Sequence, residues 1–269
     1  MSRHLPRLGV KRGLAALERA APARGASLFI YHRVGAGTRD ELDVSTEQFR
    51  AQLDALAGQD VVSIDQALDR LDEHRADPAV VLTFDDGFAD VYDNAWPLLR
   101  DRQVPFTVYL TSAYMGERMV WEGSTAKGPH GRGLTWAQLE EMVASGLCTI
   151  GNHTHTHVRP EQLTVEELDA CNDVVEHHLG VRPRHFTYPW GIPVPELEPA
   201  LAERFRSSST GLLGRNDPGT NRQRLRRIPV RQSDPLPFFE AKLTGSLRAE
   251  RTYARLVDTT KAVLKRLPG

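Results

Sequence analysis

The feature that most constrains this chain is a repeated alternation of short β-rich apolar runs with longer amphipathic segments. This alternation is typical of an α/β protein whose largely parallel strands are connected by helices. Six or more such units in one chain predict a complete or incomplete (β/α) barrel, with the chemistry at the C-terminal ends of the strands. The expected strands are Ser27–Tyr31, Ala79–Phe84, Pro105–Leu110, Cys148–Asn152, Arg184–Tyr188 and, more weakly, Arg227–Val230.

The segments between these runs carry start and stop signals for helices. The spacing of a capping box, in which side chains satisfy the free amides of the first helical turn, occurs at Ser45–Gln48, Thr135–Gln138 and Thr164–Glu167. The glycines Gly58, Gly146 and Gly180 stand where these helices should end. Pro97 should delay or kink the helix that follows Ala79–Phe84.

The chain organisation predicts one large domain with helical extensions. We expect a basic N-terminal helix within residues 1–25, the barrel over 26–245 and a C-terminal helix over 246–269. The glycine-rich stretch Tyr114–Arg132 is expected to be a long functional or mobile loop. The formal net charge of -1 gives no reason to expect nucleic acid as a partner. The two cysteines form neither a disulfide framework nor a zinc-finger pattern, which favours a reducing compartment.

The basic N-terminal segment has two interpretations. Its basic residues are Arg3, Arg7, Lys11 and Arg12, and a helix over Leu8–Ala21 would place Leu8, Leu14 and Leu17 on one side. This helix either packs on the surface of the domain or makes a peripheral contact with anionic lipid. No export signal or membrane span is evident, so we expect a cytoplasmic protein, peripheral at the inner membrane surface if the second interpretation holds.

The first motif with chemical potential is Thr83-Phe84-Asp85-Asp86-Gly87, which follows an apolar run. Two adjacent carboxylates repel each other unless a cation or a proton lies between them. A metal ion on one of them would leave the other free to act as a base, and Gly87 would permit a tight turn. The alternative is an ordinary Asp-Asp-Gly turn in which Asp86 caps the next helix.

The second motif is Gly151-Asn152-His153-Thr154-His155-Thr156-His157. If the chain turns helically after the strand, His153 and His157 share a face and His155 points away. Two neutral imidazoles with one carboxylate form a recurring catalytic metal site that suits zinc. The alternative is a polar loop with a fortuitous histidine cluster.

Two further motifs also lie at strand ends. Phe186-Thr187-Tyr188-Pro189-Trp190-Gly191 could supply a rigid wall and a backbone amide, or simply an aromatic corner of the core. His32, in Ile30-Tyr31-His32-Arg33-Val34, lies at the expected catalytic rim, although a lone histidine at a strand end is often structural.

Other side chains could bind a substrate. Tyr31, Tyr188, Trp121 and Trp190 could stack on sugar rings, or could belong to the core. The arginines Arg222, Arg224, Arg226, Arg227 and Arg231 are candidates for holding anionic groups such as a lipid pyrophosphate, and a solvated surface run is the alternative.

Taken together, the four motifs resemble the polysaccharide deacetylase family, also known as the NodB-homology or family-four carbohydrate esterases. The resemblance runs from about Ser27 to about Val230. It implies a distorted, TIM-like barrel of about seven strands and one divalent metal ion, usually zinc. It also implies removal of acetyl groups from N-acetylated sugars in polysaccharides, oligosaccharides or lipid-linked precursors, in cell-surface or exopolysaccharide biosynthesis.

The same resemblance assigns roles to individual residues. Asp85 matches the catalytic base, and Asp86, His153 and His157 match the metal ligands. Trp190 matches the position whose backbone amide stabilises the oxyanion. Tyr188 and Tyr31 remain candidates for substrate binding through their rings and are not assigned by the resemblance. His155 matches a variable position.

Two departures from the family pattern leave alternatives open. The chain has Thr187 where the family often has an arginine that orients the base, and it has no histidine after His185. A branch with an early Tyr-His-x-Val segment, which includes biofilm-exopolysaccharide deacetylases, resembles this chain better and implies His32 as the general acid. The remaining alternatives are an amidohydrolase acting on a small acetamide or formamide sugar derivative, and a catalytically impaired glycan-binding barrel.

Overall fold

The computed structural model describes residues 4–18, 23–126 and 131–264. The chain divides into two compact units. One unit is Arg24–Gln232, and the other combines the terminal segments Met1–Ala23 and Ser233–Gly269.

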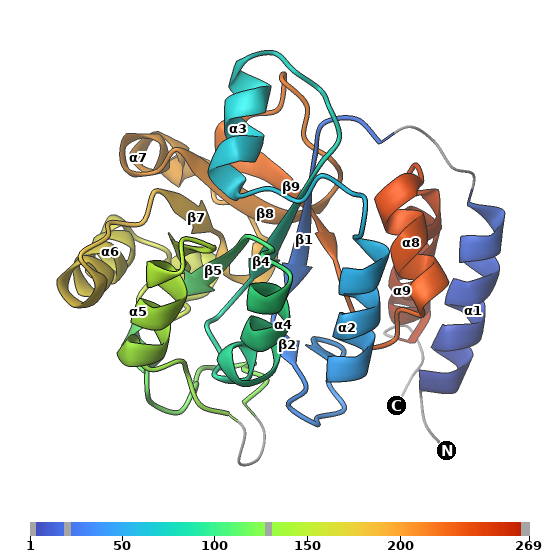
Figure 1. Ribbon diagram of the computed structural model, residues 1–269, viewed down its shortest axis with the longest axis horizontal. Coiled ribbons are helices and arrows are strands. Elements are labelled where there is room, and N and C mark those ends of the chain that lie inside the picture. The colour runs from blue at the N-terminus through green and yellow to red at the C-terminus, as the bar shows by residue number, and fades with distance from the viewer. Residues whose placement is uncertain (1–3, 19–22, 127–130, 265–269) are drawn as a thin grey trace. The chain divides into compact units, whose positions relative to one another are not determined.

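The larger unit contains a closed barrel of seven parallel strands in the order β1-β4-β5-β6-β7-β8-β9, with β9 pairing back onto β1 (Figure 1). The strands are β1 (Ala26–Tyr31), β4 (Ala79–Phe84), β5 (Phe106–Leu110), β6 (Cys148–Asn152), β7 (His185–Thr187), β8 (Ser207–Leu213) and β9 (Leu225–Pro229). The predicted (β/α) barrel of about seven strands is therefore confirmed. Two short strands, β2 (Arg33–Val34) and β3 (Asp43–Val44), pair separately.

Strand β8 was not expected from the sequence. Its first four residues, Ser207 to Thr210, are small and polar yet fully buried. The hydroxyl groups of Ser207, Ser208 and Thr210 have partners inside the protein, as in the bond that Thr210 Oγ1 donates to the Leu225 carbonyl at 3.0 Å. Closure of the barrel therefore buries a strand that lacks an apolar signature.

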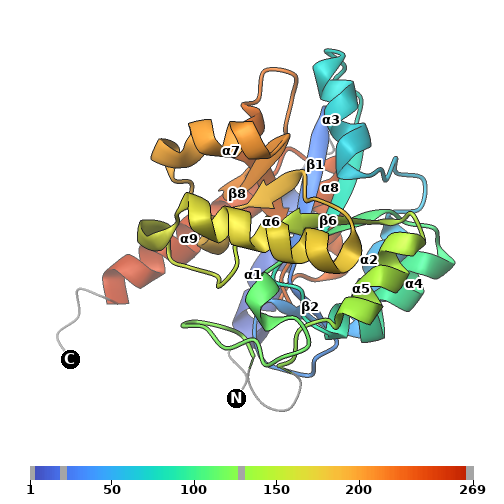
Figure 2. The same cartoon turned by 90° about the vertical axis from the view of Figure 1, so that its left-hand side faces the viewer.

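Helices surround the barrel, with α5 against β6 and α7 against β8 (Figure 2). They are α2 (Thr46–Ala55), α3 (Ile64–Asp72), α4 (Trp96–Asp101), α5 (Trp136–Ala144), α6 (Val165–Leu179) and α7 (Glu198–Arg204). Pro97 occupies the first turn of α4, which follows a π-helical turn over Val91–Ala95, so the helix starts late as predicted. Thr164 precedes α6 without a capping hydrogen bond, so the capping box expected at Thr164–Glu167 is wrong.

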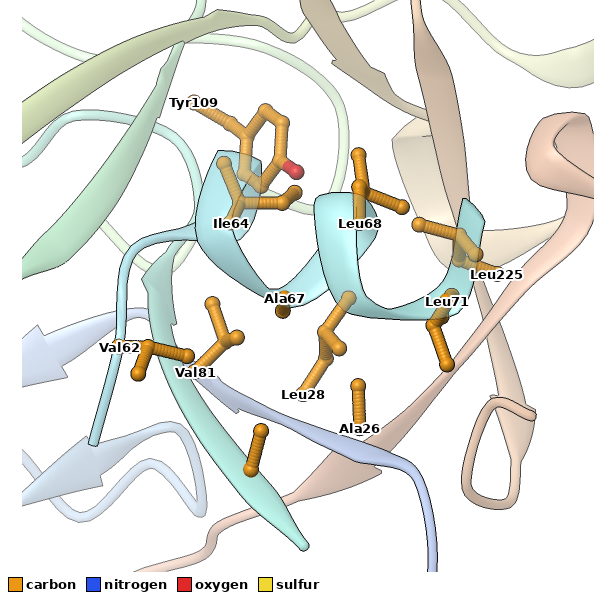
Figure 3. Close-up of a cluster of buried hydrophobic side chains, with 11 residues drawn as sticks. Ala26, Leu28, Val62, Ile64, Ala67, Leu68, Leu71, Val81, Tyr109 and Leu225 are labelled. Atoms are coloured by element: carbon orange, nitrogen blue, oxygen red, sulfur yellow. The ribbon is translucent and has the colours of Figure 1, made fainter. Parts of the chain in front are cut away.

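Helix α3 packs at the N-terminal ends of the strands. Its apolar face forms one buried cluster with the first residues of β1, β4 and β9, namely Ala26, Ala79 and Leu225 (Figure 3). Ser63 and Gln66 form a complete capping box at its start. The polar motifs lie at the opposite, C-terminal ends of the strands, because they directly follow β1, β4, β6 and β7 in the sequence.

The smaller unit contains α1 (His4–Leu17), α8 (Leu236–Thr244) and α9 (Arg248–Leu264). Leu14 of α1 packs against Phe238 and Tyr253, whereas Leu17 is exposed. Lys11 is fully buried and pairs with Asp234 at 2.5 Å, so this basic residue is not available to a lipid surface. The last part of the expected helix, residues 19–22, lies outside the described residues. Among the described helices, none has the length and apolar character that crossing a membrane would need.

Candidate metal centre

The two adjacent aspartates lie directly after β4 and are both buried. Asp86 and Gly87 adopt left-handed backbone conformations with φ of 75° and 88°, which turn the chain sharply and direct the two carboxylates to different neighbours. A Cβ atom at residue 87 would lie 2.8 Å from Leu110 Cδ2, so this turn needs glycine. The Asp86 carboxylate faces two imidazoles and caps no helix.

The histidine segment follows β6 and turns back on itself. Thr154 and His157 have φ values of 69° and 56°, and this turn brings His153 and His157 together. The Nε2 atoms of both histidines lie 3.4 Å from Asp86 Oδ1. His155 points elsewhere, with its Nδ1 2.8 Å from Ser112 Oγ, as the helical-turn interpretation predicts.

The donor set fits a divalent cation. A tetrahedral ion with ligands at about 2.0–2.1 Å places neighbouring ligand atoms roughly 3.3–3.4 Å apart. The two separations that involve Asp86 Oδ1 are 3.4 Å, and all three candidate ligand atoms lie within 4.8 Å of one another. His153 Nδ1 lies 2.8 Å from the Thr187 carbonyl, which can only accept a hydrogen bond. Nδ1 therefore carries the proton, and the lone pair of Nε2 faces the centre of the group.

The protonation of the other two groups also suits a cation. Burial lowers the pKa of His157, which favours the neutral imidazole that metal ions require. Burial alone would raise the pKa of Asp86, but the two imidazoles hold it well below its ordinary range. Asp86 Oδ1 is buried and accepts no hydrogen bond from the described residues. A buried, ionised oxygen without a donor is the arrangement that a metal ligand requires.

Asp85 forms a buried, bidentate ion pair with Arg227 of β9. Arg227 Nη1 and Nη2 donate to the two carboxylate oxygens at 2.7 and 2.8 Å, and Nε donates to the Thr210 carbonyl at 3.0 Å. Burial would raise the pKa of Asp85, but the charge of Arg227, aided by His153, lowers it below its ordinary value. The carboxylate is therefore held ionised and in a fixed orientation.

Arg227 is a functional residue that the sequence analysis missed. The prediction that it joins an anion-binding arginine run is wrong, because it is fully buried against Asp85. In the same run, Arg222 pairs with Asp72 and Arg224 with Glu198. The sequence did indicate that Arg227 is buried. Alternate residues of a strand face the same side, so Arg227 faces the same side as the apolar Leu225. Arg227 thus gives the Asp85 carboxylate the charged partner that the uncharged Thr187 cannot provide.

His32 follows β1 and lies at the edge of the same site. Its Nε2 is 4.0 Å from Asp85 Oδ2, and about a fifth of its side chain is exposed. The next residue, Arg33, is fully buried, donates from Nε to Asp90 at 2.9 Å and from Nη1 to the Thr125 carbonyl at 2.9 Å. This anchor fixes the backbone beside His32.

These groups line a pocket of about 250 Å³ with two tryptophans in its wall. The Trp121 ring stacks on His157 with centroids 4.5 Å apart, and the Trp190 ring meets His157 edge-on at 5.6 Å. Trp190 has a left-handed backbone with φ of 64°. Trp121 lies in the predicted long loop, which contains neither a helix nor a named strand in residues 115–126.

The two tyrosines predicted to bind substrate do not reach this pocket. Tyr31 is 1% exposed, and its hydroxyl donates to Gln52 Oε1 at 3.0 Å while its ring packs on Phe84. Tyr188 is fully buried against Phe186. The prediction is wrong for both, because their side chains point into the core and leave no ring face for a sugar.

Comparison with known proteins places this site in a family. The profile of the polysaccharide deacetylase family matches residues 72–202. The structure of IcaB from Ammonifex degensii is 30% identical to this chain, covers 82% of this chain and 98% of its own, and has a TM-score of 0.72. The Streptococcus pyogenes deacetylase PplD, solved in complex with acetate, shares the fold at 20% identity and a TM-score of 0.68, over 83% of this chain and 99% of its own.

Two curated relatives match a smaller part. The poly-β-1,6-N-acetyl-D-glucosamine N-deacetylase of Staphylococcus epidermidis is 28% identical over 126 residues, which are 42% of this chain and 41% of that protein. The Bacillus subtilis protein YxkH is 26% identical over 147 residues, which are 53% of this chain and 47% of that protein. The chain thus spans less than half of each curated relative. The profile match and the 30% identity over nearly all of IcaB show that this chain belongs to the polysaccharide deacetylase family.

Proposed function

We propose that the protein is a metal-dependent deacetylase that hydrolyses the acetamide group of an N-acetylated sugar. The observation that carries this proposal is the convergence of Asp86, His153 and His157 beside the Asp85–Arg227 pair in one pocket. One carboxylate with two imidazoles is a ligand set of catalytic zinc sites, and we propose zinc as the ion.

Each of these residues has a separate role in the proposed hydrolysis of the amide. Asp86, His153 and His157 would hold a divalent cation, which would supply Lewis acidity towards water and towards the substrate carbonyl. Asp85, ionised and oriented by Arg227, accepts the proton of the attacking water. The backbone amide of Trp190 donates to the oxyanion, a type of contact whose loss typically costs about 100- to 1,000-fold in rate.

His32 completes the proposed mechanism by protonating the departing amine. Its Nε2 lies 4.0 Å from Asp85 Oδ2, a separation that supports a proposed acid and a proposed base acting on the same substrate group. Among the described residues that line the pocket, His32 is the one histidine that is not a proposed metal ligand.

The substrate proposal draws on the relatives. The name of the Staphylococcus epidermidis relative specifies poly-β-1,6-N-acetyl-D-glucosamine, and we propose a glycan of this kind, as a polymer or as a lipid-linked precursor, in exopolysaccharide biosynthesis. Trp121 and Trp190, both in the pocket wall, supply aromatic faces for a sugar ring.

Acetate release from β-1,6-linked N-acetylglucosamine oligomers tests the proposal. We expect release by the zinc-loaded protein and a loss of about 100- to 10,000-fold in Asp85→Asn, which keeps the metal ligands. His153→Ala should lose zinc and activity together. Binding of the oligomers without acetate release would instead indicate a glycan-binding barrel, and release only from small acetamides would indicate the other amidohydrolase.

A further inference from the structure

Three loops from separate βα units meet on the indole ring of Trp190. Its left-handed backbone is costly for a residue with a side chain and persists only where the surroundings hold it. The contacts of the ring are part of these surroundings, beside the backbone hydrogen bond that Gly191 N donates to the Tyr188 carbonyl at 2.9 Å.

The first contact comes from the loop after β5. A Cβ atom at residue 123 would lie 2.5 Å from Trp190 Cη2, so the ring rests directly on the backbone of Gly123. The second contact is the edge of His157 at 5.6 Å. The third is Arg159, whose guanidinium carbon lies 4.9 Å from the centre of the indole.

Arg159 is itself held in place by Glu122. Arg159 Nη2 and Nε donate to the two Glu122 carboxylate oxygens at 2.6 and 3.1 Å. Glu122 follows Trp121, which stacks against His157. One ion pair thus links the loop after β5 to the loop after β6, with the ring from the loop after β7 beneath it.

This pair contributes little to the fold itself. The side chains of Arg159 and Glu122 are 45% and 77% exposed, and exposed ion pairs add little to stability. The planar guanidinium can bind a carboxylate with two bonds while stacking on an aromatic face, which the ammonium group of lysine cannot do.

We propose that Arg159, held by Glu122, is a positioning residue that fixes the Trp190 ring and thereby the backbone that directs the Trp190 amide into the site. Its effect on rate rests on the proposed deacetylase function. Its effect on the position of the Trp190 ring does not depend on that function. The effect on rate and the effect on the ring are measured separately.

The test compares Arg159→Gln and Arg159→Lys with the wild type in the zinc-loaded protein. Arg182→Gln is the matched control, because Arg182 also forms exposed ion pairs, with Asp173 and Glu176 of α6, away from the pocket. Acrylamide quenching of tryptophan fluorescence measures how accessible the Trp190 ring is to solvent. We expect more quenching in both Arg159 variants than in the control, and no difference once Trp190→Phe is added.

Kinetics report the consequence for the site. We expect kcat to fall about two- to fivefold in Arg159→Gln and Arg159→Lys, a size that suits an exposed contact. The wild-type kcat should fall with added NaCl towards the variant value, while the variant stays insensitive to salt. Glu122→Gln should behave like Arg159→Gln.

The proposal would be overturned if the Arg159 variants showed the same quenching and the same kcat as the control Arg182→Gln. Full rescue by Arg159→Lys would also overturn it, because charge alone would then suffice. A wild type that releases no acetate would contradict the proposed function, and the quenching comparison would still decide whether Arg159 positions the ring.

Discussion

At the scale of single residues, the site depends on two carboxylates that differ in their partners. Asp85 and Asp86 are adjacent and both buried, yet one faces a guanidinium and the other faces two imidazoles. The first arrangement keeps a carboxylate ionised and fixed, as a base requires. The second presents an oxygen without a hydrogen-bond donor, as a metal ligand requires.

Arg227→Gln should impair both catalysis and stability. Removing one partner of a buried ion pair leaves an uncompensated charge, which typically costs about 3–5 kcal/mol in unfolding free energy. Because Arg227 lowers the pKa of Asp85, its loss should raise that pKa. The acidic limb of the kcat profile should then move to higher pH, and stopped assays of acetate release across pH would measure the shift. An unchanged acidic limb in a folded variant would contradict the role of Asp85 as the base.

Several residues of the site could be predicted from the sequence, and the structure brings them together. Asp86, His153 and His157 were predictable because each follows a recognisable strand, and strand ends in a parallel barrel meet at one rim. The contact between Arg227 and Asp85 could not be predicted, because the two residues are 142 positions apart in the sequence. Tyr31 and Tyr188 were misplaced because a one-residue step along a strand reverses the direction of a side chain.

At the scale of elements, the histidine loop is held from α6. The Glu167 carboxylate accepts hydrogen bonds from Thr156 N and Thr156 Oγ1, both at 2.8 Å, and the Glu167 carbonyl accepts from His155 N at 3.2 Å. The side chain that resembled part of a helix cap in the sequence therefore anchors the turn between the two proposed metal ligands.

Glu167→Ala should weaken zinc binding by about tenfold while the barrel stays folded, because residues that orient metal ligands contribute about 10- to 100-fold to affinity. Glu166→Ala, in the same helical turn but exposed, is the matched control. Competition with a fluorescent zinc chelator would measure both affinities. Equal affinities in the two variants would show that the loop holds its shape without Glu167.

Elements with an apolar or capping signal were predictable within about two residues, as at β4 and β6. Strand β8 was not predictable, because the hydroxyl groups of Ser207, Ser208 and Thr210 are buried through hydrogen bonds that only the closed barrel provides. Helix α3 begins with a capping box at Ser63–Gln66, so the sequence contains the signal for its start, although that start was not predicted.

At the scale of the whole barrel, polar contacts join α3 to strands β7 and β8. Asp65 of α3 lies 3.4 Å from His185 Nε2 and accepts a bond from Arg206 Nη1 at 2.7 Å. His185 Nδ1 lies 2.9 Å from Ser207 Oγ. The nearby His185 imidazole, with the contribution of Arg206, lowers the pKa of Asp65 well below its ordinary value.

Asp65→Asn should therefore destabilise the protein at neutral pH and not in strong acid. A carboxyl group whose pKa is lowered in the folded state stabilises that state above its unfolded pKa of about 3.9, and this stabilisation is lost as pH falls through the folded pKa. We expect a loss of about 1 kcal/mol at pH 7, a value reduced because Asp65 is a third exposed and water screens the pair.

Urea unfolding at pH 7 and at successively lower pH would measure this difference, with the exposed Asp77→Asn as the control. The gap between Asp65→Asn and the wild type should shrink below about pH 4. A gap that stays constant with pH would contradict the electrostatic origin of this contribution.

The central claim is that one divalent ion, held by Asp86, His153 and His157, supports amide hydrolysis beside Asp85. The most direct test is a titration of zinc into chelator-treated protein, followed by the rate of acetate release from N-acetylglucosamine oligomers. The account predicts no release before zinc is added and a rate that saturates at one zinc ion per chain. Release that persists in the chelator-treated protein, or that does not respond to zinc or any other divalent ion, would contradict it.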